Sequence, residues 1–330
     1  MNRSVKNTGR FFLILFFFCL LLFGAWASLF YGAQKIDFSD GLNSFEKTII
    51  FDLRLPRFLL ALIAGSLLGG GGALFQLFFR NPLAESGILG ISSGATFGAV
   101  LVSLFLPFSF LGLAGINLGA FAGALAAGLL VVFISGIRNS FSTVTLLLCG
   151  TALGTFFSAF SSILLSFNSD KLQSLYGWML GSFSGRGWNE IRFILIPSFL
   201  AFILFMICAK DLDLLNGGEL VAQSLGVRMR RLRILVLLAG SLATSCAVCA
   251  GGTIGFIGLI APHIVRKFFG SKSKILIPLS MLLGAEILIF ADIICRLVIA
   301  PSEIPVGIVT ALIGSPFFIL IIFSGRNSKK

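Results

Sequence analysis

The sequence has few charged residues for its length. Only 12% of its 330 residues are Asp, Glu, Lys or Arg, whereas 57% are hydrophobic and the mean hydropathy is +1.03. A water-soluble domain of this size needs a far more polar surface, so the composition excludes a soluble fold. The chain is therefore expected in a bilayer, where a crossing helix uses about 20 apolar residues and this length allows roughly nine to eleven crossings.

Residues that catalyse reactions or bind metals are also scarce. His263 is the only histidine, and the 13 acidic residues form no cluster with metal-ligand spacing. Cys246 and Cys249 make a C-x-x-C motif, but no second pair or histidine lies near them, so we expect small packing residues rather than a metal or redox site. His263 follows Pro262 and is expected to cap or pack a short helix. We predict no catalytic residue, no metal and no cofactor; a membrane-embedded enzyme such as a lipid-modifying transferase would need the cluster that is missing.

The phosphate-binding loop G-x-x-x-x-G-K-[ST] is absent as well. That loop supplies the backbone cradle and the lysine that hold the phosphates of ATP, so this chain is not expected to hydrolyse ATP. Any ATP hydrolysis coupled to the chain must take place on separate partner subunits.

What the sequence does have is a series of long apolar runs. They predict ten membrane-spanning helices, at residues 11–31, 58–79, 88–107, 111–135, 143–167, 191–209, 234–250, 261–269, 275–298 and 306–323. The fold class is therefore an all-α polytopic membrane protein, with residues 1–330 as one integral-membrane domain. Residues 25–27, Ala-Trp-Ala, could mark a signal-peptidase site, but the apolar run continues past them and favours a retained first span.

The basic residues fit a membrane topology better than nucleic-acid binding, because they lie in short clusters between apolar runs. With a cytoplasmic amino terminus and ten alternating spans, 17 of the 25 Lys and Arg residues fall on the inner face. The other eight fall on the outer face: Lys35, Lys47, Arg54, Arg57, Lys171, Arg186, Arg192 and Arg296. This bias predicts that both termini are cytoplasmic.

Two patterns of small residues concern helix packing. Residues 61–67 (ALIAGSL) match residues 236–242 (VLLAGSL), and the two expected helices run in opposite directions. This match indicates an inverted repeat, although seven positions in apolar sequence can also match by chance. Glycines four residues apart, such as Gly65/Gly69 and Gly94/Gly98, predict close approach of helices.

The longest hydrophilic stretch expected on the inner face is the loop at about 210–233. Its residues 218–226 (GELVAQSLG) predict a short helix stopped by glycine, and Arg228, Arg230, Arg231 and Arg233 follow. One interpretation is a solvated loop whose arginines fix the topology. The other is a docking helix for a cytoplasmic partner.

Several blocks of sequence occur together in a characteristic order: RLPR at 54–57, RNPLAE at 80–85, GILGISSGA at 87–95, WMLGSF at 178–183, GFIGLIAPHIVR at 255–266, ADIICR at 291–296 and EIPVGIVTALIGSPFF at 303–318. In these blocks the chain resembles the FecCD-type permeases of ABC importers for iron-siderophores, haem and cobalamin. The resemblance runs over nearly the whole chain, and so many colinear blocks make it specific.

The resemblance implies a cobalamin-importer-permease-like bundle of ten helices in the bacterial inner membrane. It implies a dimer with a second permease subunit, either homo- or heteromeric, together with ABC ATPase subunits and an extracytoplasmic substrate-binding protein. The expected function is the translocation of an iron chelate (siderophore), or of related cargo such as haem or cobalamin, by alternating access. The alternative is a secondary transporter driven by an ion gradient, which shares the composition and the inverted repeats but needs charged groups at broken helices within the membrane.

The resemblance also assigns contacts at both faces. Arg54, Arg57 and Arg296 match family arginines that meet acidic residues of the binding protein. Pairing within the chain is the alternative, with Asp292 four residues before Arg296 and with Asp52 and Glu46 near the other two. The family's ATPase contact corresponds to the expected helix in the inner loop, with Gly218, Glu219, Ala222, Leu225 and Gly226.

Five further residues are candidates for the translocation pathway. Four hydroxyls of the fifth span recur at helical spacing on one face: Thr151, Thr155, Ser158 and Ser162. The alternative is that these hydroxyls bond their own backbone. Glu286 lies mid-membrane, where relatives usually carry an apolar residue and a charge is costly, so it should be protonated, paired or facing a water-filled cavity. We hypothesise that it faces the subunit interior and serves cargo or gating chemistry.

Overall fold

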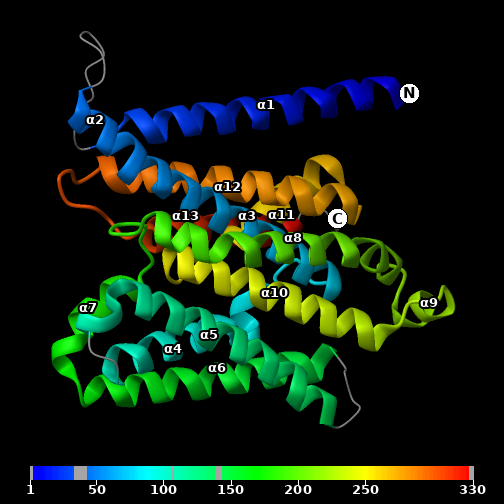
Figure 1. Cartoon of the computed structure of the whole chain (residues 1–330). Helices are drawn as coiled ribbons and strands as arrows, with labels where there is room; N and C mark the ends of the chain where they lie inside the picture. The colour runs from blue at the N-terminus through cyan, green and yellow to red at the C-terminus, as the bar shows by residue number, and fades with distance from the viewer. Residues whose placement is uncertain (1–2, 33–42, 106–107, 138–142, 327–330) are drawn as a thin grey trace.

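The computed structural model describes residues 3–32, 43–105, 108–137 and 143–326, and all regular structure in these ranges is helical (Figure 1). The elements in chain order are α1 (Arg3–Phe30), α2 (Ser44–Thr48), η1 (Ile49–Arg54), α3 (Leu55–Phe78), η2 (Ser86–Leu89), α4 (Ile91–Phe105), α5 (Phe108–Ile137), α6 (Thr143–Ser166), α7 (Ser169–Met179), α8 (Trp188–Leu215), α9 (Glu219–Ser224), α10 (Met229–Gly251), α11 (Ile257–Phe269), α12 (Ser273–Leu297) and α13 (Val306–Arg326). The predicted all-α class is confirmed.

Each of the ten predicted spans corresponds to one helix of the structure. Seven helices in the described part of the chain are long and apolar enough to cross a membrane, and α4 and α13 are shorter apolar helices. The remaining helix of the ten, α11, has only 13 residues. At 1.5 Å per residue it is about 20 Å long, so it reaches only part of the way across a hydrocarbon core of about 30 Å.

The helical path is longer than the apolar runs in three places. The second span begins at Ser44, because α2 and the π-helical turn η1 lead without a break into α3. The helix α7, which follows α6, has no counterpart in the prediction, and the predicted span at 88–107 begins inside the short η2. These segments are short or polar, so a search for apolar runs does not detect them.

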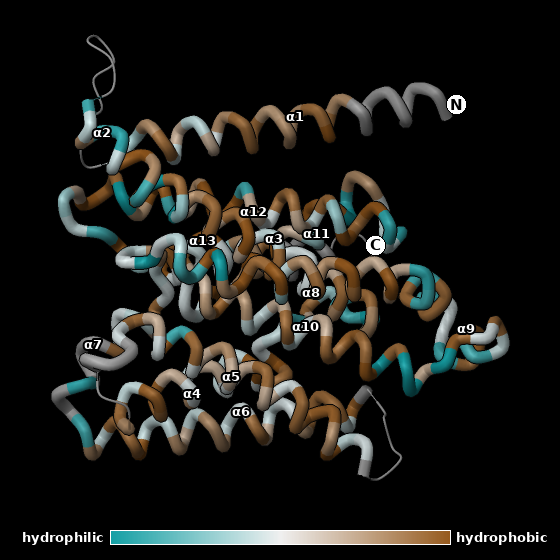
Figure 2. The backbone as a smooth tube through the Cα atoms, in the orientation of Figure 1, coloured by the Kyte–Doolittle hydropathy of each residue, from teal (hydrophilic) through white to brown (hydrophobic). Residues whose placement is uncertain are grey.

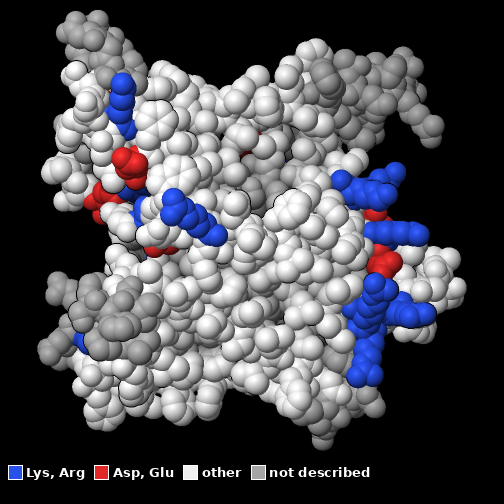
Figure 3. Space-filling view, viewed as in Figure 1, with Lys and Arg blue, Asp and Glu red and all other residues white. Residues whose placement is uncertain are grey.

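The two ends of the bundle differ in the elements that they carry. Figure 1 places α2 and α7 at one end, called the α7 end below, and α9 with the first turn of α1 at the other, called the α9 end. Hydrophilic backbone positions gather at both ends and hydrophobic positions lie between them (Figure 2). On the face shown in Figure 3, the Lys, Arg, Asp and Glu side chains likewise gather at the two ends, as expected for a membrane-spanning bundle.

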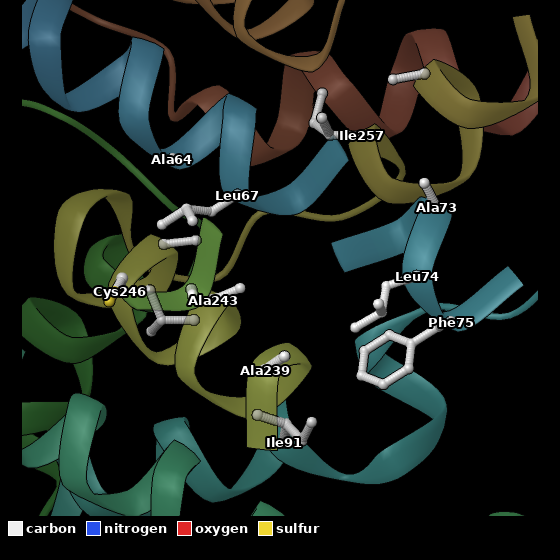
Figure 4. Close-up of a cluster of buried hydrophobic side chains, with 14 of the residues drawn as sticks. Ala64, Leu67, Ala73, Leu74, Phe75, Ile91, Ala239, Ala243, Cys246 and Ile257 are labelled. Atoms are coloured by element: carbon white, nitrogen blue, oxygen red, sulfur yellow. The ribbon is translucent and has the colours of Figure 1, made fainter. Parts of the chain in front are cut away.

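The centre of the bundle is formed by α3 and α10, which are mostly buried, whereas α1, α6 and α8 are mostly exposed. Helix α3 packs against α12, α10, α11 and α8. Figure 4 shows side chains of these central helices converging, among them Leu67, Phe75 and Cys246. Cys246 is fully buried within this apolar cluster, so its predicted packing role is confirmed.

Close helix contacts occur at the glycines that the sequence singled out. A Cβ atom built on Gly65 of α3 would lie 2.4 Å from the carbonyl oxygen of Gly284 on α12. On α4, a Cβ atom on Gly98 would lie 2.1 Å from the carbonyl oxygen of Gly119 on α5. Any larger residue would push these helices apart, so the predicted role of the glycines in close packing is confirmed.

Candidate functional site

At the α7 end, Arg57 of α3 joins two acidic side chains that are distant in sequence. Its Nε donates to Asp292 Oδ1 and Oδ2 at 3.0 and 3.1 Å, and its Nη2 donates to Oδ1 at 2.8 Å. Its Nη1 donates to both carboxylate oxygens of Glu303, at 2.7 and 2.9 Å. The planar guanidinium therefore holds α12 and the segment before α13 against α3.

Two further arginines of this end fasten α1 to the bundle. Arg296 of α12 donates from Nη1 to the carbonyl oxygen of Ser28 at 3.1 Å and from Nη2 to its Oγ at 2.9 Å. Arg54 of η1 donates from Nη1 to the carbonyl oxygen of Leu29 at 2.9 Å. Cations near a helix C-terminus satisfy its last carbonyl groups, so these contacts hold the end of α1 in place.

The three arginines predicted to contact a binding protein thus lie in one cluster, and each has acceptors within the chain. Arg296 Nε lies 3.2 Å from Asp292 Oδ2, which is the i,i+4 pairing that the sequence allowed. The acids that pair with Arg57 are Asp292 and Glu303 rather than the nearby Asp52 and Glu46. Sequence reasoning missed the partnership with Glu303, because the two residues are 246 positions apart.

A cleft of about 880 Å³ opens beside this cluster. Its charged lining residues are Asp52, Arg54, Arg57, Arg186, Glu190, Arg296 and Glu303. The α7 end therefore combines a hollow with side chains of both charges, as expected of a surface that recognises a polar partner.

Arg186, in the loop between α7 and α8, also lines the cleft. It is buried, and its Nη1 donates to the carbonyl oxygens of Cys249 at 2.8 Å and Val248 at 3.4 Å in the last turn of α10. Burial lowers the pKa of its guanidinium to about 10, so the side chain is a cation at neutral pH. A cation at a helix C-terminus is favourable, and the loop is thereby fixed to α10.

A chain of polar side chains supports the same wall of the cleft. Trp178 Nε1 donates to Asn117 Oδ1 at 2.9 Å, and Asn117 Nδ2 donates to Glu190 Oε1 at 3.3 Å. The second oxygen of Glu190 accepts from the Gly187 backbone N–H at 2.9 Å, at the start of α8. These buried bonds tie α5, α7 and α8 together, which gives the rim of the cleft a fixed shape.

At the α9 end, the short helix expected in the inner loop is present as α9. Gly218 precedes it with φ +108° and Gly226 follows it with φ +90°, a left-handed conformation that favours glycine. Ala222 is fully buried, whereas Leu220 is 82% exposed and Leu225 is 60% exposed. Figure 1 shows α9 projecting beyond the long helices, so these exposed leucines lie outside the apolar belt.

One ion pair fixes α9 to the helix that follows it. Glu219 Oε2 lies 2.6 Å from Arg233 Nη2 of α10. The two side chains are 36% and 13% exposed, so the pair is partly screened by solvent. Arg228 and Arg231, on the same loop and the start of α10, are exposed. The α9 end therefore presents an apolar helix beside exposed cations.

The four hydroxyls predicted for the pathway lie on an exposed face of α6, and each has a hydrogen-bond acceptor. Thr151, Thr155 and Ser162 donate to carbonyl oxygens of their own helix four residues earlier, at 2.9 to 3.0 Å. Ser158 Oγ donates to Ser93 Oγ of α4 at 3.2 Å. Three of the four therefore make the local backbone bonds that the sequence left open as an alternative, and they remain exposed.

Helix α13 borders a second hollow of about 510 Å³. The hollow is lined by Gly307, Ile308, Ala311, Leu312, Ser315 and Pro316 of α13, and by Met179, Leu180 and Thr253. Leu312 is 69% exposed. This mainly apolar face of α13 has no cover within the part of the chain that the structure describes.

Glu286 lies in the middle of α12 and is only 1% exposed. Neither carboxylate oxygen has a hydrogen-bond partner among the described residues. A buried polar group without a partner is costly, so its presence in a membrane helix calls for a reason beyond packing.

Comparisons with known proteins match nearly the whole chain. A model of the FecCD transport family matches residues 14–324. The Fe(3+)-citrate import system permease protein YfmD of Bacillus subtilis is 36% identical over 338 residues, which covers 100% of both chains. The vitamin B12 import system permease protein BtuC of Vibrio parahaemolyticus is 38% identical over 295 residues, 88% of this chain and 87% of that one.

Solved structures give the same picture. A transporter described as an ABC transporter of the metal-chelate type, in an inward-facing conformation, aligns with a TM-score of 0.85 at 33% identity, over 94% of this chain and 99% of that one. PsaBC from Streptococcus pneumoniae, in complex with Fab, aligns with a TM-score of 0.58 at 18% identity, over 84% of this chain and 93% of that one, which is a likeness of fold alone.

Proposed function

Because the chain belongs to the FecCD transport family, we propose that it is the membrane-spanning permease subunit of a binding-protein-dependent ABC importer. The observation that carries this proposal is the likeness to an ABC transporter of the metal-chelate type over 94% of the chain. The sequence has no phosphate-binding loop of its own, which agrees with ATP hydrolysis on separate subunits. Residues 1–330 act as one integral-membrane unit in this proposal.

The proposed cargo is an iron chelate, or a related bulky nutrient such as haem or cobalamin. Relatives that span most of the chain are named for the import of Fe(3+)-citrate, iron(3+)-hydroxamate and vitamin B12. All three cargoes are metal complexes too large for a narrow pore, so alternating access of a paired bundle is the mechanism that suits them. The chain itself performs no covalent chemistry in this cycle.

The α9 end is the proposed cytoplasmic end, where ATPase subunits dock. The exposed Leu220 and Leu225 supply apolar contacts, and Gly218 and Gly226 set the ends of the docking helix. Buried Ala222 and the pair of Glu219 with Arg233 transmit its movement to α10. The distribution of Lys and Arg supports this choice, and both termini are cytoplasmic in this proposal.

The α7 end is the proposed extracytoplasmic end, where a substrate-binding protein docks. Arg54, Arg57 and Arg296 form one cluster beside a cleft of about 880 Å³. An acidic surface on the binding protein would be attracted to these guanidinium groups and oriented by them. Their bonds within the chain hold them in fixed positions, so docking costs them little side-chain entropy.

The translocation path is proposed to lie between two copies of the permease, or between this chain and a similar one. The exposed hydroxyls of α6 (Thr151, Thr155, Ser158 and Ser162) and the uncovered face of α13 are the surfaces that would border it. A mixed polar and apolar lining suits a bulky chelate, because it guides the cargo without binding it tightly. The binding protein would then do most of the selecting.

Glu286 is proposed to take part in cargo or gating chemistry. Under this proposal both Glu286→Gln and Glu286→Leu slow uptake by about tenfold or more, a barrier change of about 1.4 kcal/mol, in protein of normal thermal stability. Ser280→Ala, which changes another buried polar side chain of α12, serves as the control. Normal uptake by both Glu286 variants would remove the role.

Uptake by proteoliposomes tests the proposed function. The permease is reconstituted with a candidate ABC ATPase subunit. It is then supplied with binding proteins loaded with Fe(3+)-citrate, a hydroxamate siderophore, haem or cobalamin. ATP-dependent uptake with one loaded binding protein supports the proposal and identifies the cargo. Uptake that follows an imposed proton or sodium gradient without ATP contradicts it and supports a secondary transporter.

A further inference from the structure

Arg57 has two counter-ions of very different character. The side chain of Asp292 is 2% exposed and contacts Nε and Nη2, whereas the side chain of Glu303 is 31% exposed and contacts Nη1 alone. Breaking the buried pair would leave an uncompensated charge in the protein interior, whereas a partly exposed pair contributes little to stability. Glu303 is therefore the exchangeable partner.

Glu303 also lies where an approaching protein would meet it. It lines the cleft of about 880 Å³ and a neighbouring cleft of about 590 Å³ that Trp178, Ser184 and Pro305 also line. The residues before it, from Val298 to Ser302, are exposed. The carboxylate therefore lies between the two clefts and next to Arg57.

The charge balance at Arg57 depends on this one residue. Asp292 also pairs with Arg296, whereas the printed ion pair of Glu303 is with Arg57. Once Glu303 turns away, the Nη1 donors of Arg57 point toward the cleft without an acceptor. A carboxylate from outside is the group that fits this fork.

We propose that Glu303 is a built-in competitor for docking: in the free permease it occupies the donor site on Arg57 that an acidic side chain of the extracytoplasmic partner takes when the partner binds. This inference rests on the proposed function, because it assumes that a binding protein docks at the α7 end. Docking and the release of Glu303 are then one exchange of carboxylates.

The exchange has a direct route to α13. Glu303 is three residues before Val306, where α13 begins. At Gly307 the helix lies so close to its neighbours that an added Cβ atom would be 2.2 Å from the carbonyl oxygen of Leu180. Release of Glu303 would free the segment that positions this tightly packed helix start, and α13 borders the proposed path. Docking would thereby be sensed by the path helix itself.

The affinity of the loaded binding protein for the full transporter in lipid nanodiscs, without nucleotide, tests the inference. Glu303→Gln removes the competing charge and should tighten binding about fivefold, the equivalent of about 1 kcal/mol. Glu46→Gln removes the same charge at the same end but outside both clefts, and it should change the affinity by less than about twofold, because long-range effects of one charge are screened. Glu303→Asp keeps the charge but shortens the reach to Arg57, and it should also tighten binding.

The outcomes separate the two proposals. Equal effects of Glu303→Gln and Glu46→Gln, or weaker binding by both Glu303 variants, overturn the competitor while docking at this end stands. Failure of any loaded binding protein to bind the wild-type transporter overturns the docking end and the competitor with it. Thermal unfolding of each variant shows that the protein is folded, and Glu303→Asp provides the answer if Glu303→Gln is unstable.

Discussion

The arginine cluster at the α7 end and the exposed arginines beside α9 differ in their surroundings. At the α7 end, Arg54 and Arg296 are each 6% exposed, and all three nitrogens of Arg57 donate to carboxylates. At the α9 end, Arg228 and Arg231 are exposed at the surface. A guanidinium in a buried network fixes geometry and is costly to disturb, whereas an exposed one adds little stability but attracts partners at long range.

The two ends also differ in how they are built, and each construction suits a different kind of proposed partner. The α7 end is a surface in which helices α1, α3 and α12 meet through the ion pairs and hydrogen bonds of Arg57 and Arg296. The α9 end carries a projecting helix that is held by the buried Ala222 and by one partly exposed ion pair. A fixed surface suits recognition of a protein that docks and leaves, and a projecting helix that contacts both α8 and α10 suits the transmission of movement.

The largest effect is expected from breaking the buried network at Asp292. Asp292→Ala leaves the guanidinium groups of Arg57 and Arg296 without their buried counter-ion, so the free energy of unfolding should fall by about 3 to 5 kcal/mol. Thermal denaturation of the purified permease in detergent measures this. Asp52→Asn, an exposed acid at the same end, is the control and should stay within about 0.5 kcal/mol. A similar loss of stability in both variants would show that the buried position of Asp292 between the arginines does not cause the effect.

The next effect sharpens the contrast at the α9 end. Leu220→Ser removes an apolar side chain that is 82% exposed, so it should leave stability unchanged and weaken the binding of ATPase subunits by about thirtyfold, equivalent to about 2 kcal/mol. Phe167→Ser, equally exposed at 83% but beside α7, is the matched control and should leave ATPase binding unchanged. Surface plasmon resonance with the permease in nanodiscs gives both affinities. Equal losses in the two variants would contradict docking at α9.

The smallest effect concerns the ion pair that attaches α9 to α10. Glu219→Gln breaks the pair with Arg233 but keeps the size of the side chain, and it should lower the free energy of unfolding by only about 0.5 to 1 kcal/mol. The rate of transport per ATP hydrolysed should fall more clearly, because the pair links α9 to α10. Parallel uptake and phosphate-release assays give this ratio. An unchanged ratio would mean that α9 moves with α10 without the pair.

Much of the fold follows from the sequence alone. Apolar runs of membrane length are long and strongly contrasted with their flanks, so the ten spans were predicted close to their observed positions. The pairs Gly65/Gly69 and Gly94/Gly98 also identified close helix contacts, because glycines four residues apart lie on one face of a helix. The segments that were missed, such as α7 and η1, are too short or too polar to give that signal.

The arrangement of the candidate site is a different matter. The residues Arg54, Arg57 and Arg296 could be singled out, but not their partners, because the contacts of Arg57 with Asp292 and Glu303 span 235 and 246 residues. Only the i,i+4 pair of Asp292 and Arg296 was readable from spacing. Tertiary packing brings Asp292 and Glu303 to Arg57, and a single sequence carries no signal for such distant contacts.

Photo-crosslinking at one position of each end tests the account most directly. A benzoyl-phenylalanine is placed at Leu220 or at Asp52 in the complete transporter, and the crosslinked proteins are identified by mass after illumination with the loaded binding protein present. The account predicts that position 220 captures the ATPase subunit alone and position 52 captures the binding protein alone. Capture of the binding protein from position 220, or of the ATPase from position 52, would contradict the assignment of the two ends.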